Sequence, residues 1–175
     1  GLWTGGLNRQ SFVECILSTA SGSAMIFLIL LGAQLFNSFL AITQMPHALA
    51  EWIGTSGFSP MTILLVMLLT YLIFGCVMDS LSMILLTIPI FFPIIESLDF
   101  GMTAEATAIW FGILALIVVE VGLITPPVGM NLFIASYRFK KPITELYSAS
   151  LPFMVILLVA LLLITYWPWL SLGPL

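Results

Sequence analysis

Charged residues are scarce in this 175-residue sequence, at 7% of the total against roughly 25% in an average soluble protein. Hydrophobic residues make up 61%, and they occur in runs long enough to cross a bilayer. With so few charges, the formal net charge of −4 is no guide to partners, and we expect no nucleic-acid partner. The composition excludes a soluble globular domain and predicts an all-α integral membrane protein.

Histidine and cysteine are also rare. The single histidine, His47, follows Pro46 in a polar stretch and is expected to be solvated. Cys15 and Cys76 lie far apart without metal-ligand spacing, so we interpret both as apolar filler, with neither a disulfide nor a metal. The sequence has no HExxH motif, no Gly-rich phosphate loop, and no second membrane-buried aspartate beside Asp79. We expect no enzyme activity, no catalytic residue and no cofactor.

The sequence also lacks an initiating methionine and a basic segment ahead of a short apolar run, so no signal peptide is visible. We expect Gly1 to be a cut end and the chain to be a fragment. The apolar runs and their polar boundaries predict an amphipathic, interfacial lead-in at 1–22, a transmembrane helix at 23–42, a re-entrant hairpin at 61–97, a transmembrane helix at 106–137, a short interfacial helix at 143–149 and a C-terminal transmembrane helix at 151–168.

Lysine and arginine occur at only two places, Arg9 and the cluster Arg138, Lys140 and Lys141. Because basic residues accumulate in cytoplasmic connections, both places are expected on the cytoplasmic side. The connections at 43–60 and 98–105 carry no basic residue, which puts them and the C-terminus outside. A hairpin and two full crossings at 61–97 give the same parity, so orientation does not separate them.

Two short apolar arms at 61–97 flank a polar centre, residues 75–82. Each arm reaches only about 20 Å at 1.5 Å per residue, short of the roughly 30 Å of a full span. A re-entrant hairpin therefore fits better than two tilted spans, which remain the alternative. Gly75 suits the end of the first arm, while Asp79 with Ser80 or Ser82 suits the cap of the second. Asp79 at membrane depth is a functional candidate, or simply an N-cap.

The apolar run 106–137 contains Gly122-Leu-Ile-Thr-Pro-Pro-Val-Gly-Met-Asn131. Pro126 and Pro127 have no N–H for the carbonyls of Gly122 and Leu123, so the helix should break at 125–127 with Thr125 and Pro126 extended. In a membrane, freed carbonyls must be satisfied by protein, water or an ion. The alternative is a proline kink repaired by neighbouring side chains. Glu120 lies before the break, either as a coupling acid or as a hydrogen-bonded structural acid.

A hairpin and a broken helix, each with irregular backbone at depth, are typical of secondary transporters that hold Na⁺ and substrate near the midplane. The half-helix that begins at Pro127 offers free N–H groups suited to a carboxylate. Carbonyl oxygens freed by prolines suit Na⁺. We expect ion and substrate binding by Gly75, Asp79, Ser80, Ser82, Thr125, Pro126, Pro127, Gly129 and Asn131, with Na⁺ candidates Gly75, Asp79, Thr125, Pro126 and Asn131.

The stretch from Gly122 to Phe133, preceded by Val-Val-Glu-Val and followed by Arg-Phe-Lys-Lys, resembles the C-terminal signature of the large membrane subunit of tripartite ATP-independent periplasmic (TRAP) transporters, the DctM-like subunits. The 75–82 tip, Ile88 to Pro93, and Leu151 to Phe153 resemble that family as well. The resemblance covers nearly the whole chain. The Pro-Pro segment is specific, whereas the apolar spans match many membrane proteins.

The resemblance implies a Na⁺-coupled, elevator-type importer of organic acids in the bacterial inner membrane, with two inverted repeats of which only the second is present here. The implied partners are the missing N-terminal half, a small TRAP membrane subunit, a periplasmic substrate-binding protein, membrane lipid and an organic-acid substrate, either dicarboxylate or sialic-acid-like. Two other readings stay open: a non-transporting membrane scaffold subunit, and a sodium/dicarboxylate symporter that needs no binding protein.

Overall fold

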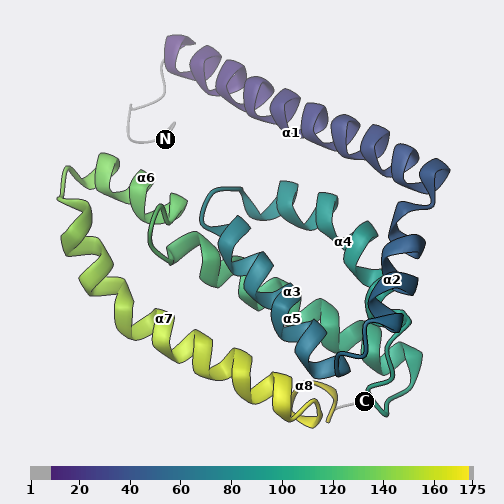
Figure 1. The fold of residues 1–175 in the computed structure, drawn as a ribbon. Helices are drawn as coiled ribbons and strands as arrows, with labels where there is room; N and C mark the ends of the chain where they lie inside the picture. Colours follow the sequence, from purple (N-terminus) through teal and green to yellow (C-terminus); the bar gives the residue numbers. More distant parts are fainter. Residues whose placement is uncertain (1–8, 174–175) are drawn as a thin grey trace.

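The computed structural model describes residues 9–173, and this part of the chain is built from helices without a strand. Figure 1 shows the long first helix on one side and α7 on the other, with α3, α4 and α5 between them. In chain order the helices are α1 (Arg9–Thr43), α2 (Met45–Thr55), α3 (Pro60–Gly75), α4 (Ser80–Glu96), α5 (Ala104–Ile124), α6 (Met130–Phe139), α7 (Ile143–Tyr166) and α8 (Trp169–Leu172).

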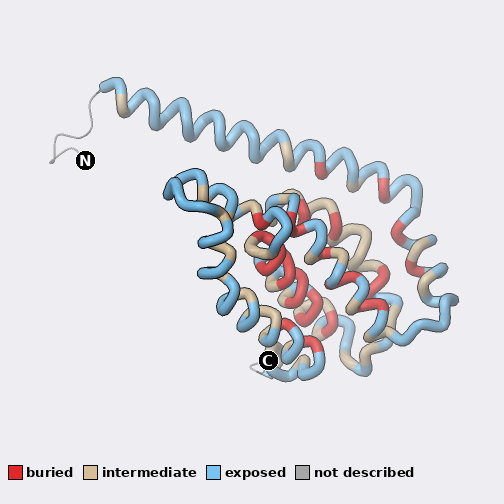
Figure 2. The backbone as a smooth tube through the Cα atoms, turned by 60° about the vertical axis from the view of Figure 1, so that its left-hand side comes forward, coloured by how far each residue is buried: buried red, intermediate tan, exposed pale blue. Residues whose placement is uncertain are grey.

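Helix α5 forms the centre of the fold and packs against α3, α4 and α7. The helix is apolar on every side. Four of its large side chains are at most 1% exposed: Trp110, Phe111, Leu114 and Val119. A helix that is hydrophobic all round belongs in a core or a membrane. The buried residues in Figure 2 concentrate on the central helices, while α1 and α7 are mostly exposed. The helix that carries the predicted break is thus held on several sides.

Local sequence signals set the starts of the central helices. Ser59 caps α3 by accepting a hydrogen bond from the N–H of Thr62, and Pro60 occupies the first helical position. Thr103 caps α5 in the same way through the N–H of Ala106. A hydroxyl at the N-cap and a proline directly after it satisfy or remove N–H groups that have no helical partner.

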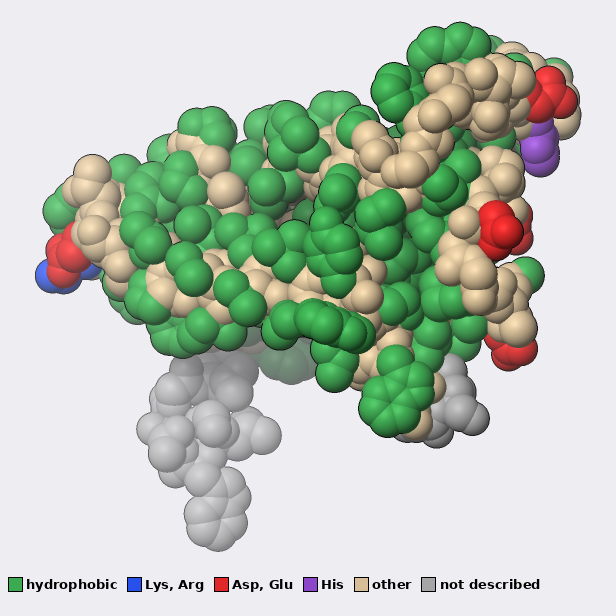
Figure 3. All heavy atoms as spheres, turned by 60° about the horizontal axis from the view of Figure 1, so that its bottom comes forward, with side chains coloured by type: hydrophobic (Ala, Val, Ile, Leu, Met, Phe, Trp, Pro, Cys, Tyr) green, Lys and Arg blue, Asp and Glu red, His purple; other side chains and the backbone are tan. Residues whose placement is uncertain are grey.

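The described surface fits a membrane protein. Helices α1, α5 and α7 are each long and apolar enough to cross a bilayer. Helices α3 and α4, with 16 and 17 residues, reach only about 25 Å, short of a span of about 30 Å. Figure 3 shows hydrophobic side chains over the middle of the visible face, with the charged side chains near its two ends. The chain is a multi-pass, all-α membrane protein.

Helix α1 differs from the predicted division into a lead-in at 1–22 and a span at 23–42. From Arg9 to Thr43 the helix is continuous, and residues 1–8 of the lead-in lie outside the described part. The polar residues taken as a boundary do not interrupt it, because side chains such as Thr19 bond back to the preceding turn, here to the carbonyl of Cys15. The segment also contains no proline.

Two further segments are more helical than predicted. The polar connection at 43–60 contains α2, which tolerates Pro46 because the proline lies in the first turn. The interfacial helix at 143–149 and the span at 151–168 are one helix, α7, which ends at Tyr166. Pro152 lies inside α7 and removes a single helical hydrogen bond, and a membrane helix can absorb such a loss.

Candidate functional site

The turn between α3 and α4 is organised by Asp79. Its Oδ2 accepts a hydrogen bond of 2.9 Å from the N–H of Ser82, so Asp79 is the N-cap of α4. Asp79 is exposed and Ser82 half-buried. The structure therefore shows the capping role that the sequence left open for Asp79. A capping carboxylate keeps free lone pairs, so a second role in binding a cation is compatible with this geometry.

The end of α3 lies directly against α5. A Cβ added to Gly75 would lie 3.0 Å from the Cα of Gly122, and one added to Gly122 would lie 2.7 Å from the Cα of Gly75. Real Cβ atoms do not approach backbone to 2.7 Å, so Gly122 must be glycine at this crossing, and Gly75 has little room for a side chain. The close approach puts the predicted hairpin tip next to the last turn of α5, ahead of the break.

Glu120 and Ser80 add a polar link between the same two elements. The Ser80 hydroxyl donates a hydrogen bond of 3.1 Å to Oε1 of Glu120. Ser80 is the first residue of α4 and half-buried, and Glu120 is an exposed residue of α5. The geometry fits the interpretation of Glu120 as a hydrogen-bonded acid and leaves its other oxygen open.

Helix α5 ends at Ile124, and α6 begins at Met130, so the interruption includes the predicted position 125–127. Thr125 is extended, with φ −91° and ψ 135°, as predicted. Its N–H bonds the carbonyl of Gly122 at 3.1 Å, and its hydroxyl bonds the carbonyl of Val121 at 2.6 Å. The expectation that the proline pair frees the Gly122 carbonyl is therefore wrong, because the turn at Thr125 closes on it.

The start of α6 depends on Gly129. Its φ of +52° lies in the left-handed region that favours glycine, and its carbonyl accepts the N–H groups of Leu132 and Phe133. Asn131 follows in the first turn and is exposed, and no side-chain hydrogen bond of Asn131 is present among residues 9–173. Its amide is thus free to bind a ligand. Pro126 and Pro127 are exposed as well.

Two residues hold the break and were not predicted to do so. The Cys76 thiol, in the turn after α3, donates to the carbonyl of Leu72 at 3.2 Å and lies 3.7 Å from the carbonyl oxygen of Pro126. The Tyr147 hydroxyl, on α7, lies 2.7 Å from the carbonyl oxygen of Val128 and 3.1 Å from that of Pro127. Cys76 was interpreted as filler, and no local pattern marks Tyr147.

The donor set limits what the arrangement can bind. No group of three or more His, Cys, Asp or Glu side chains lies close enough to hold a metal ion in the described residues. The tip and the break instead present backbone carbonyls, hydroxyls, one carboxylate and one amide. Hard cations of low charge and carboxylate ligands suit such groups, whereas a transition metal prefers nitrogen and sulfur ligands.

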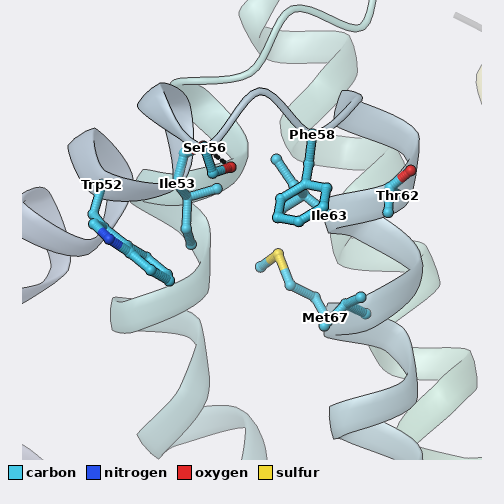
Figure 4. A pocket seen from close by; sticks show the side chains of 8 residues that line it. Trp52, Ile53, Ser56, Phe58, Thr62, Ile63 and Met67 are labelled. Carbon is cyan, nitrogen blue, oxygen red and sulfur yellow. Dashed lines mark hydrogen bonds between the residues drawn. The ribbon is translucent and has the colours of Figure 1, made fainter.

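A separate hollow of about 240 Å³ lies between α2 and α3, away from the break. In Figure 4, Trp52 and Ile53 of α2 face Phe58, Ile63 and Met67 across it. Its lining is almost wholly hydrocarbon. It therefore offers nothing that would bind a small ion or a carboxylate, and the tip and break remain the candidate site.

Comparison with known proteins adds the family. Residues 1–170 match the family model "Tripartite ATP-independent periplasmic transporter, DctM component". The chain is 38% identical over 163 residues to the C4-dicarboxylate TRAP transporter large permease protein DctM of Pseudomonas aeruginosa, which covers 91% of this chain and 37% of the relative. It is 37% identical over 167 residues to the protein of that name from Rhodobacter capsulatus, and this match covers 95% of this chain and 37% of the relative.

A relative with another named substrate is the sialic acid TRAP transporter large permease protein SiaM of Vibrio cholerae, 29% identical over 162 residues, which covers 93% of this chain and 36% of the relative. The chain thus spans a little over a third of the length of the curated relatives it matches. All three relatives are transporter permeases rather than enzymes. The chain belongs to the DctM family of TRAP transporter large permease proteins.

Proposed function

We propose that this chain is the C-terminal part of a TRAP large permease subunit and contributes a Na⁺ site and one wall of an organic-acid site. The observation that carries the proposal is the backbone contact between Gly75 and Gly122, because it sets a helix-joining turn beside a helix break. Irregular backbone of this kind at two adjoining places is what secondary transporters use to hold ions and substrate.

The cation would be held by oxygen atoms from both elements. Gly75 ends α3 and Asp79 lies in the turn after it, while Thr125, Pro126 and Asn131 belong to the break and the first turn of α6. Asp79 supplies the negative charge that offsets Na⁺, while the remaining groups are neutral oxygens. An ion held in this way avoids the cost of burying several charges together.

The anion would meet the start of α6 and the tip. The first turn of α6 presents backbone N–H groups that have no helical partner, and the positive end of the helix dipole adds to their attraction for a carboxylate. Gly129 and Pro127 shape this backbone, and the hydroxyls of Ser80 and Ser82, at the start of α4, are the proposed donors from the tip. The relatives' names, C4-dicarboxylate and sialic acid, share an organic acid as substrate.

The proposal includes partners and a location. The remainder of the large permease, a small membrane subunit and a periplasmic substrate-binding protein complete the transporter in the bacterial inner membrane, surrounded by lipid. The basic cluster from Arg138 to Lys141 lies on the cytoplasmic side, and the C-terminus lies in the periplasm. Three of the four lysines and arginines of the chain fall in this cluster, which supports that orientation.

The test is uptake of labelled succinate into vesicles by the full-length permease with its small subunit and binding protein, driven by an inward Na⁺ gradient. Asp79→Asn removes the charge but keeps a side chain that caps helices equally well. We expect it, and Asn131→Ala, to lower uptake at low Na⁺ about tenfold, as for loss of one ligand to a charged group. Asp99→Asn is the matched control, because Asp99 only accepts the N–H of Gly101 in a turn distant in sequence.

Three other results would contradict the proposed site or favour another function. Normal uptake and Na⁺ dependence in both Asp79→Asn and Asn131→Ala overturn the site assignment. The capping bond of Asp79 would serve a non-transporting scaffold subunit equally well, and wild-type protein without Na⁺-dependent uptake of any organic acid favours that reading. Uptake that continues when the binding protein is left out favours a binding-protein-independent sodium/dicarboxylate symporter.

A further inference from the structure

Tyr147 connects α7 to the broken stretch of backbone between α5 and α6. Its hydroxyl lies 2.7 Å from the carbonyl oxygen of Val128 and 3.1 Å from that of Pro127, some 20 residues earlier in the chain. The ring packs beside Gly129, where its Cε1 would lie 3.4 Å from an added Cβ. One half-buried side chain thus contacts three consecutive residues of the break.

The two contacts fix the orientation of two peptide groups. A phenol hydroxyl has one hydrogen, so it donates to one carbonyl or shares the hydrogen between both. In a planar trans peptide, the carbonyl oxygen and the N–H of the next residue point in opposite directions. The carbonyls of Pro127 and Val128 point toward Tyr147, so the N–H groups of Val128 and Gly129 point away from it.

Those N–H groups have no acceptor within residues 9–173 and come directly before the first turn of α6. With the free N–H groups of that turn, they form a short series of donors at the positive end of a helix. We propose that Tyr147 is a positioning residue that aims this series of donors at the carboxylate of the substrate. The inference rests on the proposed function, because it assigns the anion to the start of α6.

The first test measures whether the Tyr147 hydroxyl restrains the backbone of the break when no substrate is present. Val128→Cys, in a Cys15→Ser background, reports the mobility of the break by its rate of labelling with a small thiol reagent in membranes without Na⁺ or substrate. Of the two cysteines in this chain, Cys76 is buried and Cys15 is exposed, so Cys15 is the one to replace. Tyr147→Phe should raise the labelling rate about threefold to tenfold, as expected for loss of one hydrogen bond. An unchanged rate overturns the proposal.

The second test is the concentration dependence of succinate uptake by the complete transporter at saturating Na⁺. Tyr147→Phe should raise the half-saturating succinate concentration about threefold to tenfold, with the maximal rate nearly unchanged. Tyr137→Phe is the matched control, because Tyr137 is 86% exposed on α6 and makes no hydrogen bond through its hydroxyl in the described residues. It should change neither value.

The outcomes distinguish the inference from the function on which it rests. Faster labelling with unchanged uptake constants means that Tyr147 holds the backbone without serving the substrate, which overturns the positioning role. A Tyr147→Phe protein that no longer elutes as a single species overturns it as well, since the hydroxyl would then serve folding. Wild-type protein without organic-acid uptake refutes the proposed function, whereas the labelling experiment still decides whether Tyr147 holds the break.

Discussion

Gly75 and Gly122 lie in backbone contact: a Cβ built on Gly122 would approach the backbone of Gly75 to 2.7 and 2.9 Å. Such a crossing lets two helices meet more closely than any pair of side chains would allow, as small residues do in membrane helix interfaces. This contact fixes the distance between the turn after α3 and the break after α5. Both parts of the candidate site therefore depend on it.

Gly122→Ala should destabilise the protein by about 1–3 kcal/mol, because the added methyl group overfills a packed backbone crossing. Gly75→Ala should have a smaller effect, since its methyl group would meet the nearest atom at 3.0 Å. Gly112→Ala is the control, because Gly112 lies on the same helix with nothing within 4 Å of its added Cβ. The temperature at which the detergent-solubilised permease loses its size-exclusion peak measures all three. Equal behaviour of Gly112→Ala and Gly122→Ala would contradict the packing argument.

Part of this site was readable from the sequence because its causes are local. Two prolines in succession interrupt a helix wherever they stand, and the break between Ile124 and Met130 includes the predicted position. Asp79 followed by an apolar run marks an N-cap, and the capping bond to Ser82 is present. The lengths of α3 and α4 likewise follow from the polar residues around them.

The remainder depends on contacts between distant parts of the chain. Gly112 and Gly122 look alike in sequence, but only Gly122 meets another glycine, 47 positions earlier. Tyr147 lay inside a predicted interfacial helix, and nothing nearby indicates that its hydroxyl reaches the break. The continuity of α7 was not predicted, because its polar first turns resemble a separate interfacial helix, whereas the structure continues them through Pro152. Local pattern locates irregular backbone, and tertiary packing decides what holds it.

Trp110 ties α5 to α7 by a hydrogen bond of 2.8 Å from its indole N–H to the carbonyl of Ile164. The side chain is 1% exposed, so Trp110→Phe loses this bond and leaves space in the core. We expect destabilisation of about 1–3 kcal/mol, from lost hydrogen bonding and lost packing. Trp52→Phe, at a site 69% exposed, should cost little in the same thermal assay. If both variants melt alike, the Trp110 bond does not support the fold.

Tyr71 and Thr87 form a buried hydroxyl pair at 2.9 Å between α3 and α4, and the Thr87 hydroxyl also bonds the carbonyl of Met83. Tyr71→Phe removes the bond between the helices without leaving Thr87 unpaired. The cost should therefore be modest, about 0.5–1.5 kcal/mol. Thr87→Val should cost more, because it leaves the Tyr71 hydroxyl buried without this partner. Thermal unfolding of the two variants measures which one is less stable. A larger loss of stability in Tyr71→Phe than in Thr87→Val would contradict this account.

Ser80 and Glu120 connect α4 to α5 through a bond of 3.1 Å, and a double-mutant cycle measures its strength. Ser80→Ala and Glu120→Ala should each destabilise the protein, and the double variant should lose less than the sum. Because Glu120 is exposed, we expect a coupling of only about 0.5 kcal/mol, at the low end for a hydrogen bond. Glu120→Gln keeps an acceptor oxygen and should preserve most of this coupling.

If Glu120→Gln keeps the stability but abolishes Na⁺-dependent uptake, the charge of Glu120 serves transport as well as structure. If uptake survives, Glu120 acts as a structural acid alone, and Asp79 remains the candidate in this chain for the charge that balances Na⁺.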